Sequence, residues 1–97
     1  MPTYIMLSTL GPDGAATLRD HPDRLKTVTA EVEAMGVKVV AQYALLGDYD
    51  FLNIIEAPDD KTMARLAVAL GARGTLKTRT MPALPIDEFI DAIGPDS

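Results

Sequence analysis

Four stretches of the chain combine apolar and β-branched residues in short runs, each bounded by glycine or proline. They lie at residues 4–10, 37–46, 51–57 and 75–81. Runs of this length and composition are typical of β-strands. The first run is apolar on both faces, as expected of a central strand that is covered on both sides. The pattern therefore predicts four strands.

Apolar residues between these runs recur every three or four positions, which is the spacing of one helix face. After Asp13 this spacing predicts a short helical turn, a break near Asp20, and a main helix from Pro22 to Met35 that Gly36 ends. Asp59 is a good N-cap for a second helix, whose buried stripe is Met63, Leu66, Ala67 and Leu70. A final short helix is predicted from Ile86, Phe89, Ile90 and Ile93.

The resulting order, β-α-β-β-α-β with a terminal helix, predicts an α+β fold of the ferredoxin-like type. Such a fold has one antiparallel sheet with both main helices on one face. Residues 1–97 then form a single domain. The strands are too apolar for a bare second face, so we expect the sheet to pack on a second copy of the chain. The terminal helix is expected to strap the partner or to cover the end of a barrel.

The second and third strands are expected to form a hairpin with a tight turn at Gly47-Asp48. Glycine supplies the positive φ that short turns need. Tyr43, Tyr49 and Asp50 crowd this turn, although the chain has only three tyrosines and two phenylalanines. This concentration makes the turn a candidate site.

Composition narrows the classes of function. The net charge of −5 argues against a general nucleic-acid or anionic-membrane binder. The chain has no cysteine and one histidine, so we expect no metal site, and we expect no cofactor. No apolar run is long enough to span a bilayer, and a soluble cytoplasmic protein is expected.

The residues at the turn resemble the signature of the GYD domain family of small bacterial and archaeal proteins. Gly47, Tyr49 and Asp50 match its signature positions, and the runs 4–8 and 74–80 are also similar to the family. The resemblance covers roughly Tyr4 to Ile90. It implies a ferredoxin-like fold related to dimeric α/β-barrel proteins. It implies no settled activity, since barrel relatives include cofactor-free monooxygenases, isomerases and ligand-sensing domains.

A small anionic or aromatic metabolite is the expected ligand, in a cavity by the open face of the sheet. The candidate ligand-binding residues are Tyr43, Tyr49, Asp50, Asn53, Lys77 and Arg79. Two arginines and a lysine at positions 73, 77 and 79 could hold an anion, or could protect an edge strand against aggregation. They could also form a salt bridge to Asp48, Asp50 or Glu56 across an interface.

Several of these positions have a structural alternative. Tyr49 could pack over the hairpin, and Asp50 could hold the turn by accepting backbone N–H bonds. Asn53 interrupts an apolar strand, so it contacts either a ligand or a neighbouring strand. On the other face of the fourth strand, Thr78 and Thr80 could line a cavity or satisfy strand packing.

Asp50 and His21 are the candidate catalytic bases, with Arg79 as the electrostatic partner. The alternative for His21 is an exposed position at the start of a helix. Three functions follow as hypotheses: an oligomeric small-molecule-binding or regulatory module, a cofactor-free isomerase or monooxygenase-like enzyme, and a protein whose sheet serves assembly alone. In each case we expect a homodimer or higher homo-oligomer.

Overall fold

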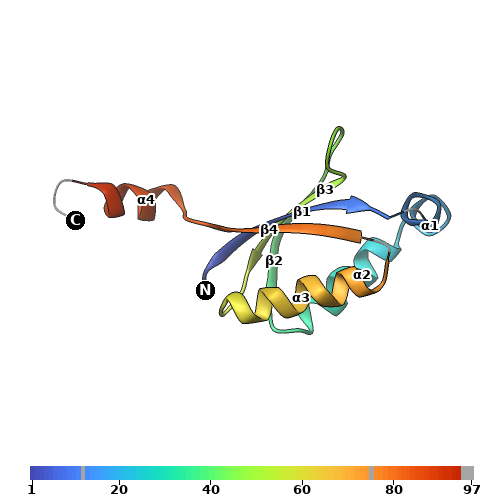
Figure 1. The fold of residues 1–97 in the computed structure, drawn as a ribbon, viewed down its shortest axis with the longest axis horizontal. Coiled ribbons are helices and arrows are strands. Elements are labelled where there is room, and N and C mark those ends of the chain that lie inside the picture. The colour runs from blue at the N-terminus through green and yellow to red at the C-terminus, as the bar shows by residue number, and fades with distance from the viewer. Residues whose placement is uncertain (12, 75, 95–97) are drawn as a thin grey trace.

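The structure is a computed structural model that describes residues 1–11, 13–74 and 76–94. Its core is one four-stranded antiparallel sheet in the order β2-β3-β1-β4, with helices against one face (Figure 1). This is the predicted ferredoxin-like arrangement. The elements in chain order are β1 (Thr3–Leu10), α1 (Gly14–Asp20), α2 (Arg24–Glu33), β2 (Lys38–Ala44), β3 (Phe51–Glu56), α3 (Asp60–Ala72), β4 (Leu76–Ala83) and α4 (Ile86–Ile93).

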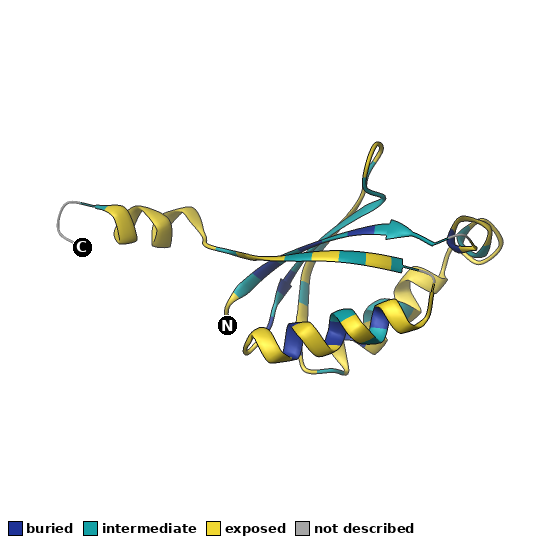
Figure 2. Cartoon of the chain, in the orientation of Figure 1, coloured by how far each residue is buried: buried dark blue, intermediate teal, exposed yellow. Residues whose placement is uncertain are grey.

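Alternation along the strands gives the sheet two different faces. In the central strand β1, Tyr4, Met6 and Ser8 are buried, whereas Ile5 and Leu7 between them are only half-buried. The buried set faces the helices, because successive side chains of a strand point to opposite faces. Figure 2 shows the buried positions in β1 and along one side of α3. We call the opposite side, with Ile5 and Leu7, the open face.

The core forms between the covered face and the two longer helices. Helix α3 contributes Met63, Leu66 and Leu70, which confirms the predicted stripe except at Ala67, which is half-buried; α2 contributes Val32. Leu66 is fully buried. The complete core is Tyr4, Met6, Val32, Val37, Ile55, Ala57, Met63, Leu66 and Leu70.

The break in the first helical region is confirmed, but the main helix is shorter than predicted. A turn at residues 21–23 separates α1 from α2, so the helix begins at Arg24 and not at Pro22. It ends at Glu33, and Gly36 follows with a φ of 95°. The predicted cap of α3 is confirmed, because Asp59 Oδ1 accepts from the Thr62 N–H over 2.9 Å.

The connection between β2 and β3 is longer than the predicted tight turn. Strand β2 ends at Ala44 and β3 begins at Phe51, which leaves a six-residue loop, 45–50. Gly47 has the expected positive φ, at 122°. Asp50 holds the base of this loop on both sides. Its carbonyl accepts from the Leu45 N–H over 2.7 Å, its N–H donates to the Ser8 carbonyl over 2.8 Å, and its Oδ2 accepts from the Leu10 N–H over 2.7 Å.

Strand β4 continues through Pro82, where the sequence predicted its end. A proline is tolerated there because β4 lies at the edge of the sheet and needs no N–H donor on its outer side. Thr75, the predicted first residue of this strand, lies outside the described residues.

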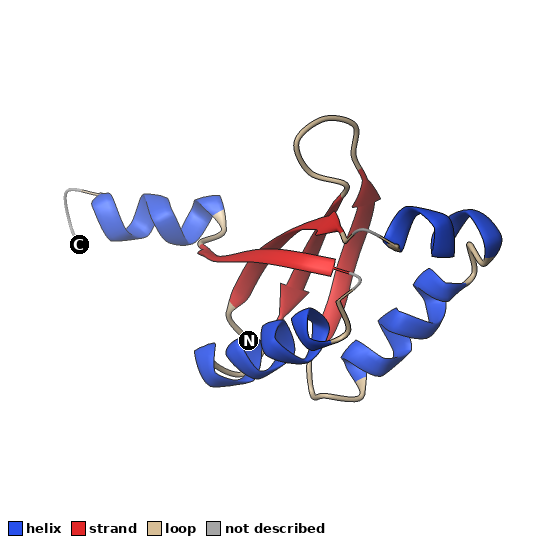
Figure 3. Ribbon diagram, turned by 45° about the vertical axis from the view of Figure 1, so that its right-hand side comes forward, coloured by secondary structure: helices blue, strands red, loops and turns tan. Residues whose placement is uncertain are grey.

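Helix α4 lies beyond the end of β4 and away from the rest of the fold (Figures 1 and 3). None of its residues is buried. The predicted helix is confirmed, but within one chain it covers neither face of the sheet.

The hydrogen bond between Tyr4 and Asp60 predicts a pH-dependent stability. Tyr4 Oη donates to Asp60 Oδ1 over 2.5 Å and ties β1 to the start of α3. This bond, burial and the negative charges of Asp60 and Asp59 raise the pKa of Tyr4 to about 12. The stabilisation requires the protonated phenol, so it is fully present below pH 10.0, the ordinary value, and is lost as the pH rises to about 12.

Urea unfolding of Tyr4→Phe therefore gives a lower midpoint than the parent at about pH 8, and the difference shrinks above pH 10. Tyr43→Phe is the control, because Tyr43 is exposed and its hydroxyl makes no hydrogen bond within the described residues. An equal difference in urea midpoint between Tyr4→Phe and the parent at about pH 8 and above pH 10 would contradict this account.

The link from Asp50 to β1 predicts that this carboxylate contributes to stability. Asp50→Ala leaves the Leu10 N–H without its acceptor, and we expect a loss of about 1–3 kcal/mol in the free energy of unfolding. Asp48→Ala in the same loop is the matched control, with an expected change within about 0.5 kcal/mol. Equal effects of the two substitutions in chemical denaturation would argue against the structural role of Asp50.

Candidate functional site

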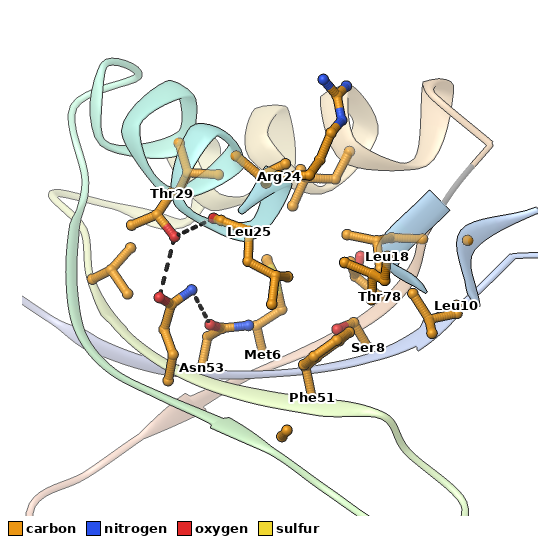
Figure 4. Close-up of a pocket in the computed structure, with 18 of the residues that line it drawn as sticks. Met6, Ser8, Leu10, Leu18, Arg24, Leu25, Thr29, Phe51, Asn53 and Thr78 are labelled. Atoms are coloured by element: carbon orange, nitrogen blue, oxygen red, sulfur yellow. Dashed lines mark hydrogen bonds between the residues drawn. The ribbon is translucent and has the colours of Figure 1, made fainter. Parts of the chain in front are cut away.

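A pocket of about 260 Å³ lies between the covered face of the sheet and helices α1 and α2, near the end of α3 (Figure 4). Its floor is made by the strands and its roof by the helices. Met6 and Phe51 provide apolar contacts on the floor, and Leu18, Leu25 and Val28 provide them on the roof. Most of the lining is therefore suited to an apolar ligand surface.

A chain of polar side chains crosses one wall of the pocket. Thr29 Oγ1 on α2 donates to Gln42 Oε1 on β2 over 3.1 Å, and Gln42 Nε2 donates to Asn53 Oδ1 on β3 over 2.9 Å (Figure 4). Asn53 thus makes the strand contact that the sequence allowed, and it also lines the pocket. Within the described part of the chain, the Asn53 amide nitrogen donates to no protein acceptor, so it remains available to a ligand.

Two hydroxyls also lie on the floor, further along the sheet from Asn53. Ser8 on β1 pairs with Thr78 on β4 and with Phe51 on β3, and both hydroxyl residues line the pocket. Ser8 occupies a core-facing position and is only 3% exposed, although its side chain is polar. Further along β4, Thr80 Oγ1 is buried and has no partner within the described residues. A core-facing layer with this many hydroxyls and amides is costly unless the polar atoms find partners.

Two arginines border the pocket, and their surroundings differ. Arg73, at the end of α3, forms an ion pair with Glu31 of α2, which links the two helices. Arg24, at the start of α2, is exposed and forms no ion pair with any described residue. Arg24 is therefore the lining cation that is free to meet an anionic group.

The structure brings together some of the expected ligand-binding residues and separates others. Tyr43 and Asn53 line the pocket, although Tyr43 is largely exposed. Tyr49, Asp50, Lys77 and Arg79 do not line it. The pocket is on the covered face of the sheet, whereas the sequence placed a cavity at the open face.

The two basic residues of β4 and the arginine that precedes this strand lie on opposite sides of the sheet. Lys77 and Arg79 alternate with Thr78 and therefore lie on the open face. Arg73 is beside the pocket on the opposite side. These three residues do not form one anion site within the chain.

The two candidate catalytic residues lie outside the pocket. His21 is exposed at the end of α1, and its backbone N–H donates to the Thr17 carbonyl. Asp50 accepts the bond from Leu10, which is the structural alternative considered for it. The described residues contain no group of three or more His, Asp or Glu side chains that could hold a metal ion.

Sequence reasoning missed Ser8, Thr29, Gln42 and Arg24 as lining residues, and considered Thr78 only as a possibility. One signal was present for Ser8. It stands two residues after Met6 and four after Tyr4 in the same strand, so its side chain shares their face. The others depend on which helix covers which strand. None of the described helices is both long enough and apolar enough to cross a membrane.

Comparison with known proteins places this geometry in a family. The model of the GYD domain matches residues 4–93. The chain is 53% identical over 91 residues to a protein of Thermus thermophilus named "Glutamine synthetase and cystathionine beta-lyase binding protein". The match covers 93% of this chain and 96% of that relative.

Two solved structures have a similar fold. TTHA0845 from Thermus thermophilus is 17% identical with a TM-score of 0.55, and the match covers 88% of this chain and 95% of that chain. FFRP-DM1 is 23% identical with the same TM-score of 0.55, covering 87% and 100%. These similarities support the ferredoxin-like fold. The family model matches nearly the whole chain, and the chain therefore belongs to the GYD domain family.

Proposed function

We propose that this protein is a regulatory module that binds metabolic enzymes, with glutamine synthetase and cystathionine β-lyase of its own organism as the first candidates. The single observation that carries the proposal is the 53% identity to a relative whose name states that it binds these two enzymes. The match spans nearly the full length of both proteins. A role among such enzymes also favours a cytoplasmic location.

The distribution of side chains supports binding over catalysis. The pocket contains no carboxylate or histidine within the described residues that could act as a general base. The surface, in contrast, exposes large apolar side chains, which commonly mark interaction sites. We therefore place the enzyme hypothesis second to a binding role.

The loop 45–50 is a suitable contact for an enzyme partner. It projects from the end of the sheet beyond the strands (Figure 1), and Leu46 within it is fully exposed. Its base is fixed by Asp50, so the loop presents Leu46 and the half-buried Tyr49 from a defined position. A loop held by a rigid scaffold loses less entropy on binding.

Binding can be measured by isothermal titration calorimetry with each purified enzyme. We expect a complex with at least one enzyme at a roughly micromolar or lower Kd. Leu46→Asp should weaken it at least tenfold, because the substitution places a charge in an apolar contact. Lys26→Asp on the exposed surface of α2 is the matched control. Absence of binding to both enzymes would contradict the proposed function, whereas binding unaffected by Leu46→Asp would contradict only the role of the loop.

A second candidate function is binding of a small molecule in the pocket. The observation that favours it is the polar floor of Ser8, Thr78 and Asn53 beneath an apolar roof, with Arg24 at the border. We propose a ligand with an apolar or aromatic body and a carboxylate. The carboxylate oxygens would accept hydrogen bonds from the hydroxyl, amide and guanidinium groups of these residues. Tyr43 and Asn53 keep their expected roles in this proposal, whereas Tyr49, Asp50, Lys77 and Arg79 would act only if another copy of the chain completed a site at the open face.

Thermal unfolding with a panel of aliphatic and aromatic monocarboxylates, from hexanoate to phenylacetate, tests the pocket. We expect at least one compound to raise the unfolding midpoint of the parent. Arg24→Ala and Asn53→Leu should abolish that rise, while Arg19→Ala outside the pocket should keep it. No rise with any compound, or a rise that survives both pocket substitutions, would contradict the proposal.

We also propose that the working form is a homodimer, the assembly that the resemblance to dimeric α/β-barrel proteins implies, in which the second copy covers the open face. Ile5 and Leu7 of β1 and Leu52 and Ile54 of β3 all lie on this face and are only half-buried. Contact with a second copy would remove these side chains from water.

A further inference from the structure

Helix α4 is an amphipathic helix without a core to pack on. Ile86, Phe89, Ile90 and Ile93 fall at positions i, i+3, i+4 and i+7 and form one apolar stripe. All four are exposed; Ile86 and Ile93 are 69% and 67% exposed, respectively. An eight-residue helix is marginal in water without tertiary contacts. Its stripe therefore needs a surface to cover it.

The link between β4 and α4 directs the helix away from its own sheet. Only Leu84 and Pro85 separate the two elements. Pro85 has extended backbone angles, φ −54° and ψ 146°, and a residue that precedes proline is itself restricted to extended conformations. The helix consequently continues outward from β4, as Figures 1 and 3 show, and the chain measures 54 Å along its longest axis.

The open face of the sheet has the complementary chemistry. The half-buried side chains of Ile5, Leu7, Leu52 and Ile54, with the exposed Met81 of β4, make this face apolar. No described helix of the same chain lies on it. Both α4 and the open face therefore have apolar surface that one copy leaves in contact with water.

Charge also favours the pairing of these two surfaces. Helix α4 carries Asp87, Glu88 and Asp91 and no basic residue. The open face of β4 carries Lys77 and Arg79. A helix lying along the apolar part of this face would place acidic side chains near these two cations, and the opposite charges attract.

We propose that α4 is an exchanged arm: the helix of each copy docks by its apolar stripe on the open face of the other copy. This inference deepens the proposed homodimer and does not depend on enzyme binding or on the pocket. It commits the arm to a second copy of this chain, because a single copy carries both halves of the contact and its two-residue link directs the arm outward.

Single-cysteine variants test the arm directly, since the natural chain contains no cysteine. One copy would carry Phe89→Cys on the stripe of α4, and the other Leu52→Cys on the open face. After co-refolding and mild oxidation, we expect a mixed disulfide between the two variants, identified by mass spectrometry. Asp91→Cys, on the acidic side of α4, is the matched control and should give at least tenfold less of it. An equal yield from Phe89→Cys and Asp91→Cys would overturn the proposal.

Sedimentation equilibrium provides the second test. Ile90→Asp should raise the dissociation constant of the dimer at least tenfold, whereas Val68→Asp, the same kind of substitution on the exposed side of α3, should leave it within twofold. Because no residue of α4 is buried, Ile90→Asp should keep the circular dichroism and unfolding midpoint of the folded body. A parent that is monomeric at every concentration overturns both the homodimer and the arm. A dimer that Ile90→Asp leaves intact overturns the arm alone. If Ile90→Asp keeps the mass of the dimer but loses enzyme binding, α4 contacts the enzyme and not the second copy, and the proposal is overturned.

Discussion

The one-sided cover of the sheet is the constraint on which the rest of this structure depends. Both core helices, α2 and α3, pack on the face that carries Tyr4 and Met6, and they leave Ile5 and Leu7 on the other. Among the described residues no further element covers the second face, because the last helix extends away from the fold. Such a chain keeps part of its apolar surface exposed unless another molecule covers it.

The covered face differs from an ordinary core because it carries polar side chains at core-facing positions. Core-facing positions in the middle of a sheet are usually apolar, but here Ser8 and Thr78 pair across β1 and β4, and Asn53 of β3 lies opposite Met6 of β1. The apolar core is concentrated instead between β1, β3, Val32 of α2 and the stripe of α3 from Met63 to Leu70. The two halves of one layer therefore serve different ends: one half stabilises the fold, and the other leaves a pocket with polar atoms in its floor.

Much of the fold could be predicted from the sequence because periodicity and turn residues act locally. The stripe of Met63, Leu66 and Leu70 and the cap at Asp59 depend only on neighbouring residues, and both are found as expected. The hairpin was predicted less well: its connection is a six-residue loop, and the bonds that hold the base of this loop join Asp50 to β1, forty residues earlier in the chain. The extension of β4 through Pro82 likewise depends on its edge position.

The candidate site was harder to predict, because the pocket is made by elements that are distant in sequence. Asn53 stood out as a polar residue in an apolar strand, and the structure places it at the pocket. Arg24 gave no comparable signal, since its position depends on how α2 crosses the sheet. Which face held the cavity could not be read from strands whose two faces are both partly apolar.

The central claim is that the apolar surface of one chain is completed by a second copy. The most direct test is the molecular mass in solution, measured by native mass spectrometry and sedimentation equilibrium over a wide range of concentrations. The account predicts a species of twice the mass of one chain. A single chain at every concentration, with α4 as accessible to limited proteolysis as a free peptide, would contradict it.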